Sequence, residues 1–473
     1  MDNFDKKIKK MIKDETWELP KEIDNSISNL LENIDEPKSI RKKTFKVAIL
    51  VASISVLTIT TAFAIENIIQ YFNYNKDSVY VSSKEEFEAF GNIVNLTSKD
   101  KGIEFTVDNI SVDDNYINVF YTIKGEKSLD EYFKEYTTGK APENPDYAVP
   151  FISAQIDENK VKNIELAEGE AKYISDNELK GIRRINISYS DVKNNFELKL
   201  HIDEIFMQKG NWSLEIDVDK SKATTETKKY NINKNIKIKN KEYSVSEEKE
   251  FDVTHYLNID KVIISPFGNQ IVVKERVDAD FTKLDGIGPI HLDSEFALVD
   301  ENNNFLEIVG KGSMGHDSTT DIVTNSFEFK LKDKDVKYLK LVPIKYIGEQ
   351  NKMLDIYDID KLPITFEMNE YGKVIIEDIQ ISDTKIKYTY STNGFVPYGP
   401  GLAFFDENEK QIGFSCHVSD YKNEKTGRIT TTLNIHEYGN DLSEIPKIKR
   451  VSTYNNTEMR LLYDEAIELD LNN

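Results

Sequence analysis

Cysteine is almost absent from this sequence. The 473 residues include a single cysteine, Cys416, so no disulfide bond can form within one chain. The fold must therefore depend on ordinary hydrophobic cores, and a chain of this length can bury about two or three of them. The residues around Cys416 alternate between apolar and polar, which indicates a strand position rather than a reactive thiol.

Basic residues are scarce relative to acidic ones. The chain has 61 Lys and Arg against 83 Asp and Glu, a formal net charge of −22. Residues 1–46 are nearly balanced, and almost all of the acidic excess follows residue 65. A surface of this sign repels phosphate backbones, so we expect no nucleic-acid partner.

The sequence also lacks the short motifs of common enzymes. It contains no G-x-S-x-G, H-E-x-x-H or P-loop pattern, and none of the six histidines pairs with another at metal-ligand spacing. His316 and Asp317 follow Gly312-Ser313 and resemble half of a catalytic site. No third group completes it, and short Gly-Ser stretches are usually loops. We therefore predict no enzymatic activity, no cofactor and no metal site.

Long uncharged stretches are rare too, but one is present, from Val47 to Ile65. A helix over this range would extend roughly 28 Å, close to the hydrocarbon thickness of a bilayer. Basic residues crowd its N-terminal side from Arg41 to Lys46, and the first cation after it is Lys76. By the positive-inside rule we predict a single-pass protein of the cell membrane, with a cytoplasmic N-terminus and an extracellular C-terminal ectodomain.

Two other interpretations of this stretch compete with a membrane span. A buried core helix would also be apolar, but the one-sided basic flank argues for a membrane span. A cleaved signal peptide is the stronger alternative, because Ala62-Phe63-Ala64 has the small-x-small form of a cleavage site. Signal peptides total about 15–30 residues, and here residues 1–46 already precede the apolar run. We favour an uncleaved signal anchor, and cleavage after Ala64 stays open.

The cytoplasmic head, residues 1–46, is predicted to contain two short helices. Pro20 suits the start of the second helix, and Pro37 ends it. This helix has one apolar stripe, which so short a segment cannot bury by itself. The stripe therefore needs a partner, and we favour a protein over the lipid surface that nearby lysines would suit. The predicted partner-binding residues are Ile23, Ile27, Leu30, Leu31 and Ile34.

Strand signals dominate the rest of the chain. Residues 66–95 are predicted to form a juxtamembrane stalk, and from about residue 96 apolar and polar residues alternate. Many short strands and frequent turns are typical of immunoglobulin-like antiparallel β-sandwiches, although the Cys…Trp…Cys hallmark is absent. The predicted fold class is mainly β. Its expected parts are a first β module at 96–220, a linker at 221–229, a second module at 230–370 and a third at 371–473.

Three short patterns recur along the chain in the same order. The first is a strand ending in a turn, the second has the form A-x-φ-D-E-N, and the third resembles F-E-L-K-L. This recurrence predicts three related modules. The copies are at 108–112, 260–264 and 377–381 for the first pattern, at 154–159, 297–302 and 403–408 for the second, and at 196–200, 327–331 and 431–435 for the third.

Two regions of the chain also suggest ligands. Asp300, Glu301 and Asn302 offer oxygen atoms to calcium, but no EF-hand pattern is present and Asp and Asn are common in tight turns. We therefore favour turn chemistry. Tyr388, Tyr390, Tyr398 and the loop 394–401 would suit an exposed face for a glycan or a peptide. Aromatic residues in strands more often belong to a core, which we favour here.

Several segments resemble a known family. These are Leu19-Pro20-Lys21-Glu22-Ile23 in the head, Thr61-Ala62-Phe63-Ala64 at the end of the apolar run, and two strand segments at 94–98 and 107–112. Together they resemble Gram-positive bacterial membrane proteins that carry the domain of unknown function 4179, often with immunoglobulin-like C-terminal modules. The resemblance implies an anti-sigma-factor-like regulator. Zinc-binding anti-sigma heads use a His and a Cys-x-x-Cys, and residues 1–46 contain neither.

Two functional hypotheses follow from these observations. In the first, the head binds an extracytoplasmic-function sigma factor in the cytoplasm, and the acidic ectodomain senses a ligand or stress in the envelope. In the second, the chain is a surface-anchored extracellular binding or adhesion protein with immunoglobulin-like modules and no role in transcription. The ligand, the sigma partner, the oligomeric state and the route of the signal across the membrane stay open.

Overall fold

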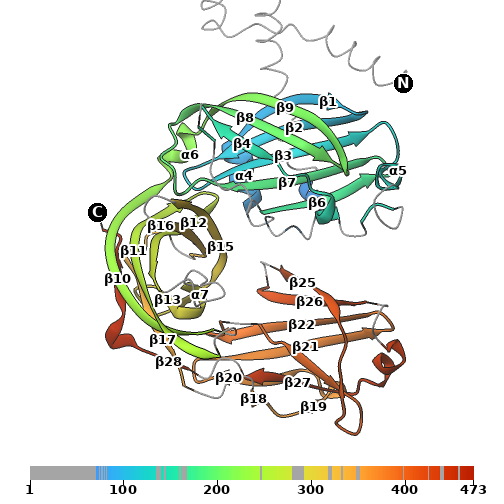
Figure 1. Cartoon of the computed structure of the whole chain (residues 1–473), viewed down its shortest axis with the longest axis vertical. Coiled ribbons are helices and arrows are strands. Elements are labelled where there is room, and N and C mark those ends of the chain that lie inside the picture. Colours follow the sequence, from blue (N-terminus) through green and yellow to red (C-terminus); the bar gives the residue numbers. More distant parts are fainter. Residues whose placement is uncertain are drawn as a thin grey trace, which may run out of the picture. The chain divides into compact units, whose positions relative to one another are not determined.

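A computed structural model describes the chain from residue 71 onward (Figure 1). The predicted head, the predicted membrane span and the first residues of the stalk therefore lie outside the described residues. No helix in the described part of the chain is long and apolar enough to cross a membrane. The description covers 71–472 except 74, 76–77, 79, 81–82, 135–139, 143–144, 158, 161–167, 245–247, 280–291, 318–321, 332–333, 348–351, 398, 424–425, 437–440 and 456–458.

The chain is mainly β and its sheets are antiparallel, as predicted. The first sheet pair comprises β1 to β9. One sheet has the order β1-β2-β3-β7-β6 and the other has the order β5-β4-β8-β9. The strands are β1 Gly91–Asp100, β2 Ile103–Val112, β3 Tyr116–Gly125, β4 Ser153–Ile156, β5 Asn159–Lys160, β6 Glu168–Ser175, β7 Glu178–Asn186, β8 Asn195–Ile205 and β9 Gln208–Asp219.

The second sheet pair has the same kind of arrangement. Its larger sheet has the order β10-β11-β12-β16-β15, and in its smaller sheet β13 and β17 are central. The strands are β10 Lys228–Ser244, β11 Lys249–Ser265, β12 Gly268–Asp278, β13 Phe296–Val299, β14 Phe305–Leu306, β15 Ile308–Asp317, β16 Ile322–Phe329, β17 Tyr338–Tyr346, β28 Met459–Leu461 and β29 Ile467–Asp470.

The third sheet pair repeats this order once more. One sheet runs β20-β21-β22-β26-β25, and the other is built on β27 and β23. The strands are β18 Lys352–Met353, β19 Tyr357–Asp358, β20 Ile364–Asn369, β21 Gly372–Ser382, β22 Lys385–Gly394, β23 Leu402–Phe405, β24 Gln411–Ile412, β25 Cys416–Asn423, β26 Arg428–Ile435 and β27 Arg450–Asn455.

The last strands of the chain belong to the second sheet pair. β28 and β29 both pair with β17, for example through Ile344 opposite Leu461 and Leu341 opposite Ile467. Leu469 is fully buried in the second core. Conversely, β18, β19 and β20 precede residue 371 and belong to the third pair. The range predicted for the third module, 371–473, thus contributes strands to two sheet pairs.

Short helices connect the strands. The predicted linker at 221–229 contains a helix, α6, and the start of β10. The predicted stalk contains the helix α4, which begins at Lys84. The helices are α4 Lys84–Phe90, α5 Leu129–Phe133, α6 Ser221–Thr225 and α7 Leu292–Glu295, with 3-10 turns η2 Pro145–Ala148, η4 Ile359–Lys361, η5 Leu442–Lys447 and η6 Tyr463–Glu465.

The first sequence pattern marks the same β-bulge in every sheet pair. The pairing register slips at Asp108 in β2, at Asp260 in β11 and at Glu377 in β21. Each of these carboxylates accepts a hydrogen bond from a side chain 14 positions later, on the next strand. The prediction that these three hairpins are repeats is confirmed, since in each hairpin the bulge residue accepts a hydrogen bond from the residue 14 positions later.

The third pattern does not mark equivalent strands. The segment at 327–331 begins in β16 and the one at 431–435 lies in β26, both in the larger sheet of their pair. The segment at 196–200 lies in β8, in the smaller sheet of the first pair. That part of the repeat prediction was wrong, because alternating apolar and polar residues suit any half-buried strand.

Candidate functional site

Polar and aromatic side chains gather where the first sheet pair meets the second. The turn between β2 and β3, residues 113–115, contacts the turn between β11 and β12, residues 265–268. The stalk residues that the structure describes also reach this place. We call it the junction, and it is the candidate functional site.

Asp113 ties the two turns of the junction together. One carboxylate oxygen accepts the backbone N–H of Asn115 and of Tyr116, at 2.7 and 2.8 Å. The other accepts the Ser265 hydroxyl at 2.7 Å and the backbone N–H of Phe267 at 2.9 Å. Burial raises the pKa of Asp113, while these four hydrogen bonds act in the opposite direction. A shorter side chain at this position would release both turns.

Asn115 and Gly268 bring the two turns close together. The Asn115 amide donates to the Ser265 hydroxyl and to the Gly268 carbonyl, both at 2.8 Å. Gly268 has a φ of 141°, and a β-carbon there would lie 2.4 Å from Glu328 and 2.7 Å from Arg184. Glycine is required at this position because any side chain would collide with the ion pair beside it.

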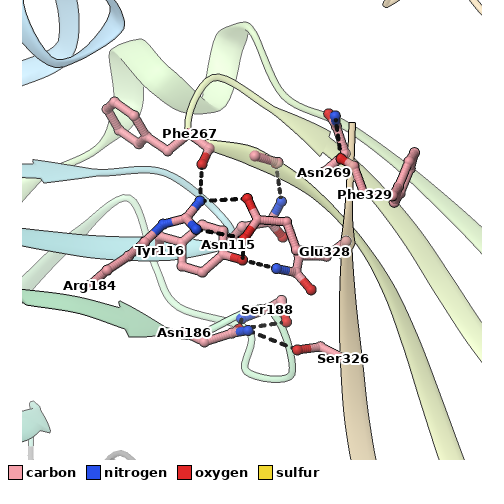
Figure 2. A network of polar contacts seen from close by, with 12 residues as sticks. Asn115, Tyr116, Arg184, Asn186, Ser188, Phe267, Asn269, Ser326, Glu328 and Phe329 are labelled. Carbon is pink, nitrogen blue, oxygen red and sulfur yellow. Dashed lines mark hydrogen bonds and ion pairs between the residues drawn. The ribbon is translucent and has the colours of Figure 1, made fainter. Parts of the chain in front are cut away.

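A buried ion pair crosses the junction. Arg184 of β7 donates two hydrogen bonds to the Glu328 carboxylate of β16, at 2.6 and 2.8 Å (Figure 2). The guanidinium lies 3.4 Å from the centre of the Tyr116 ring and also donates to the Phe267 carbonyl. The Tyr116 hydroxyl donates to Glu328 at 2.9 Å. These bonds offset the cost of removing two charges from water, as a buried pair requires.

The stalk adds an aromatic cluster to the junction. Tyr71, Phe72 and Phe87 are buried against Phe120 of β3, on the face of the larger sheet that is turned away from the first core. Phe87 also stacks on Phe267 of the second sheet pair, with ring centres 5.1 Å apart and planes 16° from parallel. Residues of β3 are therefore buried on both faces, and every residue from Tyr116 to Tyr121 is buried.

Glu170 of β6 holds the start of the described stalk. It accepts a hydrogen bond from the Tyr71 hydroxyl at 2.6 Å, from Asn75 at 3.3 Å and from Ser78. Burial, and then the charge of Glu170, raise the pKa of Tyr71 well above its usual value. The stalk is thus attached to the first sheet pair by polar as well as aromatic contacts.

The segment that links the first two sheet pairs is attached as well. Lys220, which follows β9, is buried and forms an ion pair with Asp114 of the 113–115 turn. Lys229 of β10 approaches the same carboxylate at 3.2 Å. Sequence reasoning treated residues 221–229 as a polar linker. Lys220, just before this range, and Lys229, at its end, instead pair with a buried acid, which no local pattern reveals.

Some polar atoms of the junction have no hydrogen-bond donor among the described residues. They are the side-chain oxygens of Asn115, Asn269 and Gln270, all buried. A buried unpaired polar atom costs about 1–3 kcal/mol, which contact with water removes.

The residues predicted as a partner-binding stripe lie outside the described residues, so the structure does not bear on them. They are Ile23, Ile27, Leu30, Leu31 and Ile34. The junction residues were not singled out from the sequence. One signal was available, the pair Arg183-Arg184 within the apolar strand segment 181–185.

The recurring D-E-N segments are turns. Asp300 accepts the backbone N–H of Asn302 and of Asn304, each at 2.8 Å, and Asp406 accepts those of Asn408 and Lys410. Their oxygens are therefore used within the turn, in agreement with the interpretation favoured above. In the described part of the chain, no group of three or more His, Cys, Asp or Glu side chains is placed to hold a metal ion.

The remaining candidates fall in strands. Gly312-Ser313 and His316 lie in β15, although a loop was expected there. Cys416 lies in β25, as predicted, and burial raises the pKa of its thiol. Tyr388 and Tyr390 are buried in the third core, and Tyr398 lies outside the described residues. Both tyrosines also line an open groove of about 570 Å³ in the third sheet pair, the third-pair groove.

One arrangement missed by the sequence resembles a catalytic triad. The His201 ring lies 2.8 Å from the Ser213 hydroxyl and 2.7 Å from the Asp203 carboxylate. However, the Asp203 side chain is 87% exposed, and the Ser213 hydroxyl also bonds with Asn211. Water competes for these bonds, and we assign them no catalytic role.

Two protein families match the chain. Residues 37–125 match DUF4179, a domain of unknown function, and residues 240–368 match DUF5643, a family of unknown function. The first match confirms the resemblance stated above, and the second was not predicted. The first matched region includes the stalk and Asp113, and the second includes Phe267 and Glu328. The two regions are separate in sequence and contact each other in space at the junction.

Comparison with other proteins adds little. No curated protein matches the chain significantly. Among solved structures, the chain is similar to a crystal structure described as the conserved domain protein from Bacillus anthracis. The two share 12% identity with a TM-score of 0.34, over 59% of this chain and 84% of the other.

Proposed function

We propose that this chain, whose residues 37–125 belong to the domain family DUF4179, is a single-pass membrane regulator of the anti-sigma-factor type. In this proposal the head binds an extracytoplasmic-function sigma factor in the cytoplasm. The acidic ectodomain senses the envelope, and the junction links the two. The sequence of residues 1–65 supports the proposed membrane topology and the proposed sigma-factor partner. The junction supports the proposed connection between the ectodomain and the membrane-proximal stalk.

The observation that carries the proposal is the attachment of the stalk. Tyr71 closely follows the predicted span, and it is buried against the first sheet pair and bonded to Glu170. Phe87, further along, contacts the second sheet pair through Phe267. A ligand or force that separates the two sheet pairs would therefore change the segment that leaves the membrane. A free linker would not transmit such a change.

The test is recovery of partners with a C-terminally tagged full chain from solubilised cells. We expect a sigma factor with the wild-type protein and its loss from the double variant Ile27→Asp/Leu30→Asp, since two charges on the stripe prevent apolar contact. The matched control is Asn25→Asp/Asn29→Asp, which adds the same charges to the opposite face of the predicted helix.

Each outcome bears on a separate part of the proposal. Equal recovery of a sigma factor with both double variants would refute the stripe as its binding site. Recovery of envelope components alone, with no sigma factor from any variant, would refute the regulatory role. A tagged product that begins near Ile65 would refute the uncleaved anchor.

A second candidate function is a surface-anchored binding protein with no transcriptional role. One observation favours it, the open third-pair groove beside Tyr388 and Tyr390. This candidate predicts that deletion of residues 2–36 leaves transcription unchanged while binding to the outer modules persists. A transcriptional reporter in the deletion strain distinguishes the two candidates.

We also infer that the sheet pairs are immunoglobulin-like sandwiches. Their strand order supports this inference. β2-β3-β7-β6 and β5-β4-β8-β9 correspond to the orders A-B-E-D and C′-C-F-G of that fold, with β1 as an addition. A crystal structure of the chain tests it, since the two sheets of such a sandwich cross at about −30°.

A further inference from the structure

The third-pair groove opens between the two sheets of the third pair. Its walls come from β22, β25 and β26 on one side and from β23 and β24 on the other. Its volume of about 570 Å³ falls within the range of roughly 300–1,000 Å³ that is usual for small-ligand sites. Gly401 and Gly413 border it, and a β-carbon built on either would meet no atom within 4 Å.

The groove is open because the connection above it is short. In the first sheet pair, the connection from β3 to β4 covers residues 126–152 and includes η2, which packs on β6. Tyr173 of β6 also donates to the Pro142 carbonyl of that connection at 2.9 Å. In the third pair the corresponding connection, between β22 and β23, covers only 395–401. The position corresponding to β6 is occupied by β25, which is left uncovered.

Aromatic rings stand on both walls of the groove. Tyr388 and Tyr390 lie on one wall with ring centres 6.1 Å apart, and Phe404 and Phe414 lie on the other with ring centres 5.8 Å apart. The faces of such rings are negative and attract cations as well as apolar groups. Tyr388, Tyr390 and Phe404 are at most 4% exposed, so the apolar surface open to a ligand comes from less buried lining residues such as Phe414 and Val418.

A single charged side chain lines the groove, the carboxylate of Asp420. It accepts a hydrogen bond from Thr431 at 2.5 Å, and no Lys or Arg in the described part of the chain forms an ion pair with it. Burial raises the pKa of Tyr388 to about 12, and the Asp420 charge adds to that rise. A carboxylate therefore lies close to the tyrosine rings, at an exposed position of the groove.

We propose that the third-pair groove binds an ammonium group carried on a short apolar chain, such as a lysine side chain between apolar residues of a peptide. Asp420 pairs with the ammonium group, and the half-buried Phe414 and the exposed Val418 contact the apolar parts. The acidic ectodomain attracts such a ligand from solution. This inference stands independently of the sigma-factor proposal, because it concerns a different part of the chain and a binding event measured directly.

The test uses the full chain in nanodiscs of zwitterionic lipid. The probe is the peptide acetyl-Leu-Lys-Leu-amide, and matched peptides carry either acetyl-lysine or glutamate in the central position. Affinity is measured by calorimetry. Access to the groove is measured by the rate at which Cys416, the one cysteine of the chain, reacts with a maleimide.

We expect the lysine peptide to bind at least about tenfold more tightly than either matched peptide and to slow the reaction of Cys416. Asp420→Asn should weaken its binding about fivefold, because the ion pair is partly exposed. Asp383→Asn is the matched control, since it removes the same charge from an exposed turn of the third pair and should change nothing. Gly413→Trp should fill the groove and abolish binding of every peptide.

Several results would overturn the proposal. Equal affinity for the three peptides would exclude recognition of the ammonium group. Tight binding that survives both Asp420→Asn and Gly413→Trp would place the site elsewhere. Binding of chitotetraose in preference to the lysine peptide would make the groove a glycan site, and failure of the lysine peptide to bind at all would refute the proposal outright.

Discussion

At the scale of single residues, the junction depends on charges that are removed from water. Arg184 is 6% exposed, and its carboxylate partner Glu328 is 14% exposed. Exposed ion pairs contribute little to stability, whereas a buried charge without its partner is costly. The contribution of Glu328 to the stability of the junction is therefore best compared with that of a more exposed glutamate in the same sheet pair.

Glu328→Gln should weaken the junction by ~3 kcal/mol, because it leaves Arg184 buried without a counter-charge. Hydrogen exchange at residues 113–116 and 265–268 should accordingly rise about a hundredfold. The control is Glu307→Gln, which removes a half-exposed partner of Lys330 and Lys422 and should leave this exchange unchanged. Similar exchange in both variants would contradict a role for the buried pair.

The bulge residue Asp108 leads to a prediction about pH. Burial raises its pKa, while Lys180 and Thr122 act to lower it. The folded protein therefore binds the proton more tightly than the unfolded chain does. The stabilising effect of the group is fully present below the ordinary aspartate pKa of about 3.9 and is lost as the pH rises through the raised value.

Asp108→Asn removes this titration and keeps an acceptor for Thr122. The melting temperature of the variant minus that of wild type should therefore increase between about pH 4 and pH 7. Thermal unfolding at both pH values measures this difference, with Asp383→Asn as an exposed control. A difference that is constant with pH would show that Asp108 titrates normally.

At the scale of elements, the strands closest in sequence are not always partners in space. β29 ends the described chain, yet it pairs with β17 of the second sheet pair. Leu469 fills the second core beside Leu339 and Leu341. The second sheet pair is therefore complete only after the third has been synthesised.

Leu469→Ala should destabilise the second sheet pair by about 2–4 kcal/mol, since it leaves a cavity in a closed core. Hydrogen exchange should increase in β17 and not in β22. Leu433→Ala in the third core is the matched control, and it should increase hydrogen exchange in β22 and not in β17. Increased exchange in β22 with Leu469→Ala would refute the assignment of β29 to the second pair.

At the scale of the whole described chain, the junction joins the stalk to two sheet pairs. Phe267 of the second pair touches the stalk, by stacking on Phe87 and contacting Phe90 edge-on. It is 2% exposed. Its truncation therefore tests whether the second sheet pair influences the segment that follows the predicted span.

Phe267→Ala should raise hydrogen exchange in residues 71–73 and 84–90, because the loss of a buried ring costs roughly 3 kcal/mol and opens the aromatic cluster. Val418→Ala, at an exposed position of the third pair, is the control. Unchanged exchange in the stalk would mean that the first sheet pair alone holds it, and the proposed link would fail.

The sequence by itself determined the features that depend on neighbouring residues. The two-residue period predicted strands, the recurrence at 108–112, 260–264 and 377–381 predicted equivalent hairpins, and Asp300 was correctly assigned to a turn. Each of these signals lies within a few positions along the chain, where covalent geometry and alternation of side chains decide the outcome.

Only the tertiary structure decided which distant segments meet. It paired β29 with β17, opposed Arg184 to Glu328, buried Tyr71 on the outer face of a sheet and left the third-pair groove open. The physical reason is that sheet pairing and the burial of charge are satisfied by partners far apart in sequence. The alternation around F-E-L-K-L at 196–200 shows the limit, because the same local pattern suits either sheet of a pair.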